Sequence, residues 1–415
     1  MTTPDQSHTP SATPTGSGAA GSPPNQPTAS PAMLAVLTAA AFVIFAQIFM
    51  VAPILPALAH AFATTPGVVG LAVPAFLIPY GAMTLLWGPV SDRLGRRPIM
   101  LASLGGLTIL TGLTALAPSA GVFLGLRLVT ALGASGVVPI ALALIGDRVP
   151  YARRGRALGW IFGGMAGGMA FGAAAGALAE PVLGWRGLFL VAATAGLILL
   201  VAALVLRVLP ATPRPAAPPP IRTIAAGYAG LLSTARARRT YGYILINAVL
   251  QSGIYTWLGL FVQQRFGLGE LGIGLTLLGY GIPGFLLGPL IGRAADHWGR
   301  ARVIPAGVML TAACALALAA PLPRAGAQAA IVLLSLGYDM TQPPLAGIVT
   351  DLPGHRGQAM GLNVFTLFTG FGLGALLFQA TLTAAGFPTA YLLFGGTAVI
   401  AAIAAIRLFT TERPR

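Results

Sequence analysis

Two ionisable residues, Asp339 and Arg127, lie deep inside long apolar stretches of the sequence. An ionisable side chain with such neighbours is costly unless it is paired or faces a wet cavity, so a functional role is the default interpretation. A carboxyl group in a cavity of low dielectric can bind and release protons, which makes Asp339 the candidate proton-binding residue. Two plainer interpretations stay open. Asp339 could be hydrogen-bonded to hold its helix in register, and Arg127 could extend its long side chain to an interface.

A stripe of polar side chains indicates a cavity wall. Tyr243, Asn247, Gln251 and Tyr255 recur every four residues, which places them on one face of an otherwise apolar helix. Hydrogen bonding between neighbouring helices is the alternative explanation. Other polar residues in apolar stretches are predicted to line the same cavity: Gln47, Tyr338, Gln342, Asn363 and Thr366, with Tyr80 or Tyr280 as weaker members.

One charged motif occurs twice, as "WGPVSDRLGRRPIM" at residues 87–100 and as "IGRAADHWGRARVI" at residues 291–304, and both copies contain G-x-x-x-D-x-x-G-R. Its candidate functional members are Asp92, Arg93, Arg96, Arg97, Asp296 and Arg300. A carboxylate there can lie against the positive end of a helix, and arginines can form bidentate pairs that break when parts of the molecule separate. The alternative is that these loop charges are solvated signals of topology, and the repetition with flanking glycines weakens that alternative.

The composition is that of a polytopic membrane protein. Of the 415 residues, 56% are hydrophobic and 8% are charged, and the mean hydropathy is +0.83; soluble domains carry about a quarter of charged residues. Apolar runs of about 18 to 25 residues can each cross a bilayer as a helix, whereas open strands would leave backbone groups unpaired in lipid. Twelve helices are predicted, near residues 33–56, 68–90, 98–117, 121–145, 157–179, 185–208, 241–263, 271–291, 302–320, 326–349, 358–383 and 387–408.

The charge distribution predicts the orientation. The formal net charge is +15, and the arginines gather in alternate loops. By the positive-inside rule, both termini and the central linker are expected to be cytoplasmic. So little chain is exposed that the positive charge does not indicate nucleic-acid binding.

Missing residue types exclude several kinds of site. The sequence has no lysine, so the phosphate-binding loop G-x-x-x-x-G-K-[ST] cannot be formed. The single cysteine, Cys314, cannot make an internal disulfide, and the four histidines show no zinc-binding pattern. No cofactor and no metal are therefore predicted. The absence of G-x-S-x-G, of H-E-x-x-H and of a carboxylate pair within one span disfavours an enzyme.

The two motif copies indicate a tandem duplication. Gly88 and Gly292 are 204 residues apart, and "RGRALG" at 154–159 corresponds to "RGQAMG" at 356–361. The predicted organisation is a disordered cytoplasmic tail at 1–32, an N-terminal six-helix bundle at 33–208, a Pro- and Arg-rich cytoplasmic linker at 209–240, a C-terminal six-helix bundle at 241–408 and a cytoplasmic tail at 409–415.

On these motifs the chain resembles a major facilitator superfamily transporter, and within it the twelve-helix drug/proton antiporter branch. The family's loop G-x-L-a-D-R-x-G-R-[KR] appears at residues 88–97, and "GWRGLF" at 184–189 resembles its entry into helix 6. The resemblance implies an all-α membrane protein of twelve transmembrane helices in two pseudo-symmetric six-helix bundles, with the substrate held between them. It also implies that Asp92, Arg93, Arg96 and Arg97 latch the cytoplasmic side.

Two further motifs match that branch in part. "RLVTALGASG", beginning at Arg127, resembles an arginine motif linked to proton coupling, with Thr130 and Ala131 in place of the usual Gln and Gly. The small residues at 163–179 resemble the antiporter motif G-x-x-x-G-P-x-x-G-G. Ala173 stands where the proline belongs, and Ala177 replaces the last glycine.

These features predict a secondary active transporter of the bacterial-type inner membrane that exports a small amphipathic or drug-like molecule in exchange for protons. Proton-coupled uptake or facilitated diffusion of a sugar or metabolite stays open, because helix 1 lacks the acid that is common in multidrug exporters. A non-transporting membrane receptor is a distant alternative. The expected partners are a small-molecule substrate, protons and the lipid bilayer; nucleic acid is not expected, and the protein is expected to be a monomer.

Overall fold

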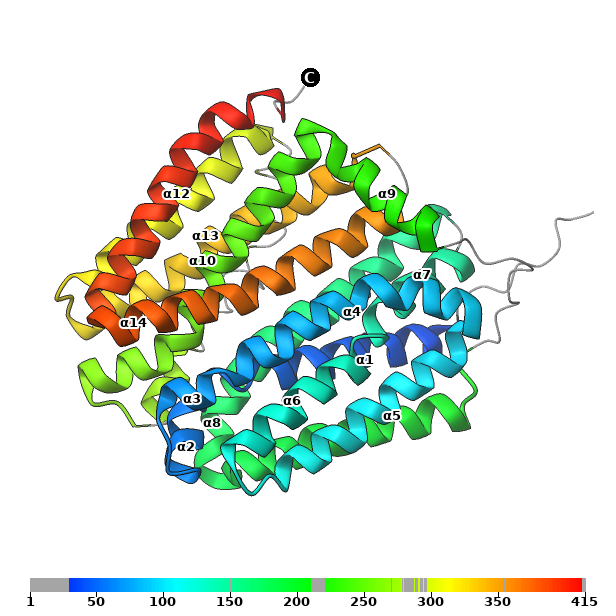
Figure 1. Cartoon of the computed structure of the whole chain (residues 1–415), viewed down its shortest axis with the longest axis horizontal. Helices are drawn as coiled ribbons and strands as arrows, with labels where there is room; N and C mark the ends of the chain where they lie inside the picture. Colours follow the sequence, from blue (N-terminus) through cyan, green and yellow to red (C-terminus); the bar gives the residue numbers. More distant parts are fainter. Residues whose placement is uncertain are drawn as a thin grey trace, which may run out of the picture.

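The computed structural model describes residues 30–149, 151–209, 221–269, 271–277, 279, 287, 290–291, 294, 297–353 and 356–412. These residues form helices joined by short turns, and none of them lies in a strand. Figure 1 shows the arrangement of the helices in space.

The first half of the chain begins with a capped helix. Ser30 accepts a hydrogen bond from the backbone N–H of Met33 (3.1 Å), and Pro31 follows at the first helical position, where no backbone donor is needed. In chain order the helices are α1 (Pro31–Phe49), α2 (Leu55–Ala61), α3 (Pro66–Gly70), α4 (Ala72–Leu94), α5 (Arg96–Ala115), α6 (Ala120–Ala134), α7 (Val137–Arg148) and α8 (Tyr151–Val205).

The second half begins earlier than the sequence predicts. Thr234 caps α10 by accepting from the N–H of Ala237 (3.2 Å), so this helix starts inside the segment predicted as linker. In chain order the elements are α9 (Ile221–Ser233), α10 (Ala235–Phe266), α12 (Arg300–Ala319), α13 (Arg324–Thr350), α14 (Arg356–Leu408) and the short 3₁₀ helix η1 (Thr410–Glu412). We call the end of the molecule with α9 and η1 the linker end, and the end with α2 and α3 the opposite end (Figure 1).

Glycines with positive φ mark equivalent places in the two halves. Gly95 (φ +94°) and Gly299 (φ +81°) each precede the helix that follows the repeated charged motif. Gly184 (φ +66°) and Gly386 (φ +77°) turn the chain inside α8 and α14. This region of φ favours glycine because it has no Cβ. The members of the two pairs are 204 and 202 residues apart, so the same turns recur once in each half, as a duplication requires.

The helices are long and apolar enough to span a membrane. Eight candidate spans lie among the described residues. Two of them, Gly159–Val205 and Gly357–Leu408, contain 47 and 52 residues and include the turns at Gly184 and Gly386. At 1.5 Å per residue each is about 70 Å or longer, more than twice the ~30 Å hydrocarbon core, so each accounts for two crossings. Together with α13 and the helical residues at 271–277, this is consistent with the twelve predicted spans.

The two halves have separate hydrophobic cores. One core is built mainly from residues between Met33 and Leu209, and the other mainly from residues between Leu231 and Phe409. Figure 1 shows the helices of the first half, from blue α1 to α8, beside those of the second half, which end in red at the end of α14. The chain is therefore two helical bundles that meet along one boundary.

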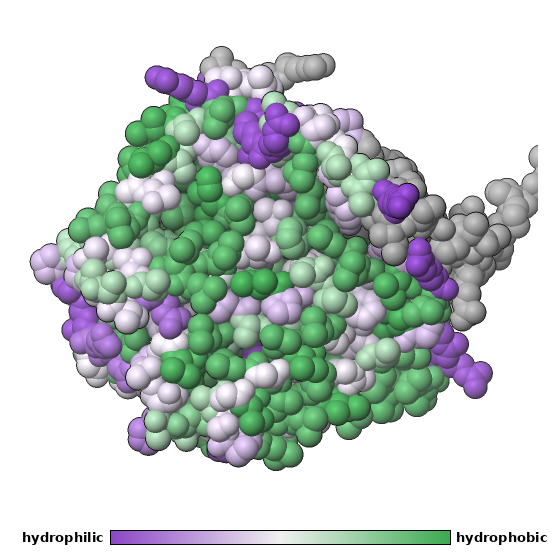
Figure 2. Space-filling model, viewed as in Figure 1, coloured by the Kyte–Doolittle hydropathy of each residue, from purple (hydrophilic) through white to green (hydrophobic). Residues whose placement is uncertain are grey.

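The surface matches a membrane environment. Hydrophilic side chains gather at the two ends of the molecule, and the face between them is mostly apolar (Figure 2). Large apolar side chains such as Ile198, Ile400 and Ile406 are exposed. An apolar surface of this extent belongs in lipid.

Glycines allow close packing inside each bundle. Cβ atoms added at Gly164, Gly168 and Gly172 of α8 would press on backbone atoms of Thr38, Phe42 and Ala46 of α1, and one added at Gly176 would press on Met50, which caps α1. In the second half, Gly370 and Gly374 of α14 lie in the same way against Leu245 and Val249 of α10. Small residues let helices approach closely in membranes, and here the same seam occurs in both bundles.

Candidate functional site

Aromatic side chains from both bundles meet along the boundary between them. The centroid distances across the boundary are 5.8 Å for Phe45 and Phe368, 6.2 Å for Phe49 and Phe371, 6.0 Å for Phe49 and Tyr255, and 4.7 Å for Tyr80 and Phe368. Tyr338 joins them through Phe371 at 6.2 Å. We call these seven residues the central aromatic cluster. Its rings come from α1, α4, α10, α13 and α14, so both halves build it.

Asp339 lies beside this cluster. It follows Tyr338 directly, is half-buried, and accepts a hydrogen bond from the hydroxyl of Ser335 one turn earlier (3.3 Å). No described arginine forms an ion pair with it. Gly337 packs against Thr311 of α12, and two residues further along a helix is about 200° around its axis. Asp339 therefore points away from α12.

Several predicted cavity residues carry buried polar atoms that have no hydrogen-bond partner among the described residues. These atoms are Gln47 Oε1, Asn247 Nδ2, Gln251 Oε1, Gln342 Oε1 and Asn363 Oδ1, and the Tyr80 hydroxyl is a sixth. Leaving such a group unpaired costs about 1–3 kcal/mol, and native proteins pair nearly all of them with protein or water. The contributing helices are those that build the aromatic cluster. The unsatisfied atoms fit a chamber that holds water or a polar ligand.

The predicted stripe on α10 faces more than one surface. The Tyr243 hydroxyl donates to the carbonyl of Ala401 in α14 (2.9 Å), inside the second bundle, whereas the Tyr255 ring lies against Phe49 of the first half. Each step of four residues over-rotates an α-helix by about 40°, so three steps turn the stripe by about 120°. Outside this stripe, the hydroxyl of Thr366 in α14 donates to the carbonyl of Leu362 in the same helix (2.7 Å). Contact of Tyr255 and Thr366 with a substrate stays a prediction, whereas the bonded hydroxyl of Tyr243 favours the alternative of a hydrogen bond between neighbouring helices.

Arg127 is buried inside the first bundle, with 1% of its surface exposed. Its guanidinium carbon lies 4.2 Å from the centre of the Phe76 ring and 5.9 Å from that of Phe189. Its Nε and Nη1 atoms have no acceptor among the described residues. The side chain does not extend to an interface, so that sequence-based alternative is wrong.

The two halves also touch at the opposite end. Trp257 of α10 is 1% exposed, and its Nε1 donates to the carbonyl of Ala375 (3.2 Å). The Trp257 ring occupies the space where a side chain at Gly70 of α3 would lie. Gln379 Nε2 of α14 donates to the carbonyl of Gly67 (2.7 Å). Residues of the second half thus hold α3 of the first half in place.

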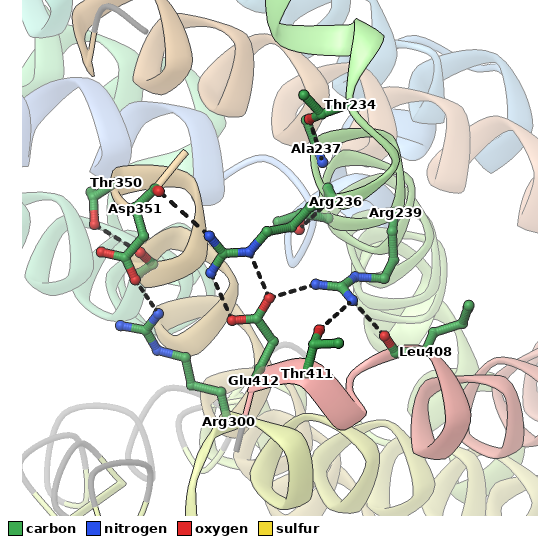
Figure 3. Close-up of polar contacts among 12 residues, drawn as sticks. Thr234, Arg236, Ala237, Arg239, Arg300, Thr350, Asp351, Leu408, Thr411 and Glu412 are labelled. Atoms are coloured by element: carbon green, nitrogen blue, oxygen red, sulfur yellow. Dashed lines mark hydrogen bonds and ion pairs between the residues drawn. The ribbon is translucent and has the colours of Figure 1, made fainter. Parts of the chain in front are cut away.

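At the linker end, Glu412 of η1 lies between two arginines of α10 (Figure 3). It accepts from Arg236 Nε and Nη2 (both 2.8 Å) and from Arg239 Nη2 (2.6 Å). The hydrogen bonds from Arg236, and then those from Arg239, hold the pKa of the Glu412 carboxyl below its ordinary value. The carboxylate therefore stays ionised at neutral pH and ties the end of the chain to α10.

The predicted gate residues are described only in part. Arg300 Nη1 pairs with Asp351 Oδ2 (2.5 Å) and joins the start of α12 to the end of α13 (Figure 3). Arg93 is exposed, whereas Arg96 and Arg97 are half-buried. The side chain of Asp92 and the whole of Asp296 and Tyr280 lie outside the described residues. The gate as a whole stays a prediction.

Sequence reasoning missed part of this site. The phenylalanines of the cluster are spaced three or four residues apart, as Phe45 and Phe49 are, which is the spacing of one helix face. That signal does not distinguish a site from a lipid-facing surface.

Comparison with known proteins agrees with this architecture. The family model of the Major Facilitator Superfamily matches residues 37–362 and 270–415. The uncharacterized MFS-type transporter YwfA of Bacillus subtilis (strain 168) is 28% identical over 381 residues, covering 89% of this chain and 90% of the relative. A chloramphenicol resistance protein of Pseudomonas aeruginosa is 30% identical over 277 residues, covering 65% of this chain and 64% of the relative.

Solved structures share the fold. The nucleoside transporter NupG has a TM-score of 0.73 at 14% identity, covering 91% of this chain and 100% of that one. The human organic anion transporter MFSD10 has a TM-score of 0.69 at 19% identity, covering 90% and 99%. Because the family model matches most of the chain and the relatives are MFS-type transporters, the chain belongs to the major facilitator superfamily, as a transporter and not an enzyme.

Proposed function

We propose that this protein exports a small amphipathic or drug-like molecule in exchange for protons. The observation that carries the proposal is the position of Asp339, a half-buried carboxyl without a described cationic partner, next to Tyr338 of the central aromatic cluster. An ionisable group inside a membrane protein marks a proton or substrate pathway by default. The rings offer apolar contact area for an amphipathic molecule.

The proposed mechanism is alternating access, in which the two bundles rock about the central aromatic cluster. Proton binding to Asp339 shifts the balance between the two orientations, because a ligand shifts an equilibrium by its differential affinity for the two states. For release at the opposite end, the contacts of Trp257 with Gly70 and of Gln379 with Gly67 must open.

We assign the remaining residues to three roles. Polar contact with the substrate falls to Gln47, Asn247, Gln251, Gln342 and Asn363, whose unpaired atoms a ligand or water would satisfy. Arg127 takes part in proton coupling, on the motif that it begins. The arginines at 93, 96, 97 and 300, with Asp92 and Asp296, form the gate at the linker end.

The orientation follows from the positive-inside rule. Exposed arginines such as Arg93, Arg238 and Arg407 belong to the linker end, so we place that end, with both termini, in the cytoplasm. The two bundles are proposed to extend over 33–208 and, with the start of α10 at Ala235, over 235–408, in a monomer of the inner membrane.

Export is favoured by the resistance function that names the Pseudomonas relative. Uptake or facilitated diffusion of a metabolite remains the second candidate, since α1 carries no acidic residue. Direction is tested by measuring accumulation in inverted and in right-side-out vesicles.

The coupling residue is tested with Asp339→Asn in inverted vesicles under an imposed pH gradient. We expect uphill transport to be lost, because the side chain can no longer bind and release a proton. Exchange of labelled for unlabelled substrate needs no gradient and is expected to persist, which shows that the protein still folds and binds. An Asp339→Asn protein that still moves substrate uphill would remove Asp339 from the mechanism.

A further inference from the structure

We propose that Arg127 forms a buried anion-binding site in the first bundle, which takes either an acidic group of the substrate or a small inorganic anion such as chloride. The guanidinium of Arg127 is a buried charge without a described ionic partner. A guanidinium is always protonated in proteins. Arg127 is 1% exposed, yet its Nε and Nη1 have no acceptor and no described carboxylate pairs with it.

The contacts within the protein do not compensate for this burial. The Phe76 ring, at 4.2 Å, and the more distant Phe189 ring provide cation–π attraction. Such contacts attract the cation, most strongly where it is desolvated. Taking an unpaired ion out of water costs more than these contacts return, even after the protein relaxes. The difference favours binding of a negative charge beside the guanidinium.

The aromatic side chains around Arg127 indicate the direction of access. Toward the opposite end, four rings pack together: Phe62 with Trp185 at 5.1 Å, Phe62 with Phe123 at 5.7 Å and Phe123 with Phe189 at 5.6 Å. These rings close that side of the bundle.

On the other side, Phe76 stacks on Tyr80 (5.8 Å), which contacts Phe368 of the second bundle (4.7 Å). The hydroxyl of Tyr80 is buried and also lacks a partner among the described residues. Phe76 and Tyr80 thus connect Arg127 with the central aromatic cluster, and the Tyr80 hydroxyl places a polar atom between them. An aromatic molecule that carries a carboxylate fits this combination, as does a small halide.

The substrate form of this inference rests on the transport function proposed above, whereas the inorganic form does not. The two sources are separated by choice of anion. Benzoate is compared with its neutral isostere benzamide, and chloride or bromide is compared with the bulky anion isethionate at constant ionic strength.

The experiment measures the thermal unfolding of the purified full-length protein as each anion is titrated. A ligand that binds only the folded state raises the unfolding temperature by mass action. We expect a saturable rise with benzoate, with chloride, or with both, and none with benzamide. Arg127→Met is expected to weaken the apparent affinity by about 10- to 100-fold, the loss of a charged hydrogen-bond partner.

Arg186→Gln is the matched control. Arg186 also lies on an aromatic ring, 4.3 Å from that of Trp185, but it is exposed and donates to the carbonyl of Ala117 (3.2 Å). This variant is expected to keep the anion response of the wild type. Asp339→Asn should keep it as well, so that a failure of proton coupling and a failure of the anion site give different results.

Where Arg127→Met does not fold, Arg127→Lys replaces it. Lysine keeps the charge but loses the planar donor geometry, so benzoate binding should weaken more than halide binding. The proposal is overturned if the wild type shows no saturable anion response, or if Arg127→Met responds as the wild type does.

Discussion

At the scale of single residues, we expect Tyr80 to act in substrate binding and Tyr243 to act in helix packing. The Tyr80 hydroxyl has no partner among the described residues, whereas the Tyr243 hydroxyl donates to Ala401 (2.9 Å). Tyr80→Phe should therefore leave thermal stability unchanged or slightly raised, yet weaken substrate binding. Tyr243→Phe should lower stability by about 1 kcal/mol, the net value of one hydrogen bond, with substrate affinity unchanged.

Thermal unfolding and equilibrium substrate binding, measured on both variants, check this pair. The assignment of Tyr80 to the site fails if Tyr80→Phe destabilises the protein and binds substrate normally. Each variant serves as the control of the other, because both remove one buried hydroxyl and nothing else.

Single residues also show what sequence could predict. Asp339 and Arg127 stand out because ionisable side chains are rare in apolar runs. Phe45 and Phe368 do not stand out, since the exposed Phe162 and Phe171 occur in the same kind of sequence. Whether a phenylalanine faces lipid or the boundary between bundles depends on tertiary packing, which a single apolar run does not encode.

At the scale of helices, the glycine seam between α1 and α8 gives a prediction. A Cβ on Gly172 would overlap the backbone of Ala46, whereas nothing lies within 4 Å of one added to Gly163 of the same helix. Gly172→Ala should lower the free energy of unfolding by about 1–3 kcal/mol through overpacking. Gly163→Ala should be neutral or stabilising, because alanine is the better helix former.

The unfolding temperatures of Gly172→Ala and Gly163→Ala, measured in the same detergent, test this prediction. Equal stability of the two alanine variants would mean that α1 and α8 do not pack as described. The comparison removes the general effect of Gly→Ala on helix stability, since both positions lie inside α8.

The helical character of the spans was predictable, but the bounds of the helices were not. Hydropathy indicates the spans, and the duplicated motif predicts where the two bundles correspond. The start of α10 at Ala235 was missed because Arg236, Arg238 and Arg239 make that turn polar. Those arginines lie in a helix because Thr234 caps it, and two of them bind Glu412, which is 173 residues or more away in sequence. No local pattern predicts such a contact.

At the scale of the whole molecule, the two bundles share their turns and their internal seams, so motion between them is expected to occur at the boundary. The contacts across this boundary differ in kind. In the centre, the contacts are between the rings of the central aromatic cluster. At the opposite end, Trp257 packs against Gly70, where no side chain is present. The fit at Gly70 therefore decides whether that end can close.

Gly70→Ala is expected to hold the opposite ends of the two bundles apart. The added methyl would overlap the Trp257 ring, which cannot easily move because it is 1% exposed and bonded to the carbonyl of Ala375. An overpacking cost of about 1–3 kcal/mol shifts a two-state equilibrium by roughly 5- to 150-fold. The population open at the opposite end should rise, and transport should slow.

Spin labels at Leu116 and Leu271, both exposed, report the separation of the two bundles in a Cys314→Ala background. We expect the distance distribution of Gly70→Ala to move to longer values than in the background protein. Gly121→Ala in α6 is the control, because nothing lies within 4 Å of its added Cβ, and its distribution should not move. If the distribution of Gly70→Ala is unchanged and its transport is normal, closure at this end does not depend on the Trp257 contact. Other contacts between the two bundles would then control closure.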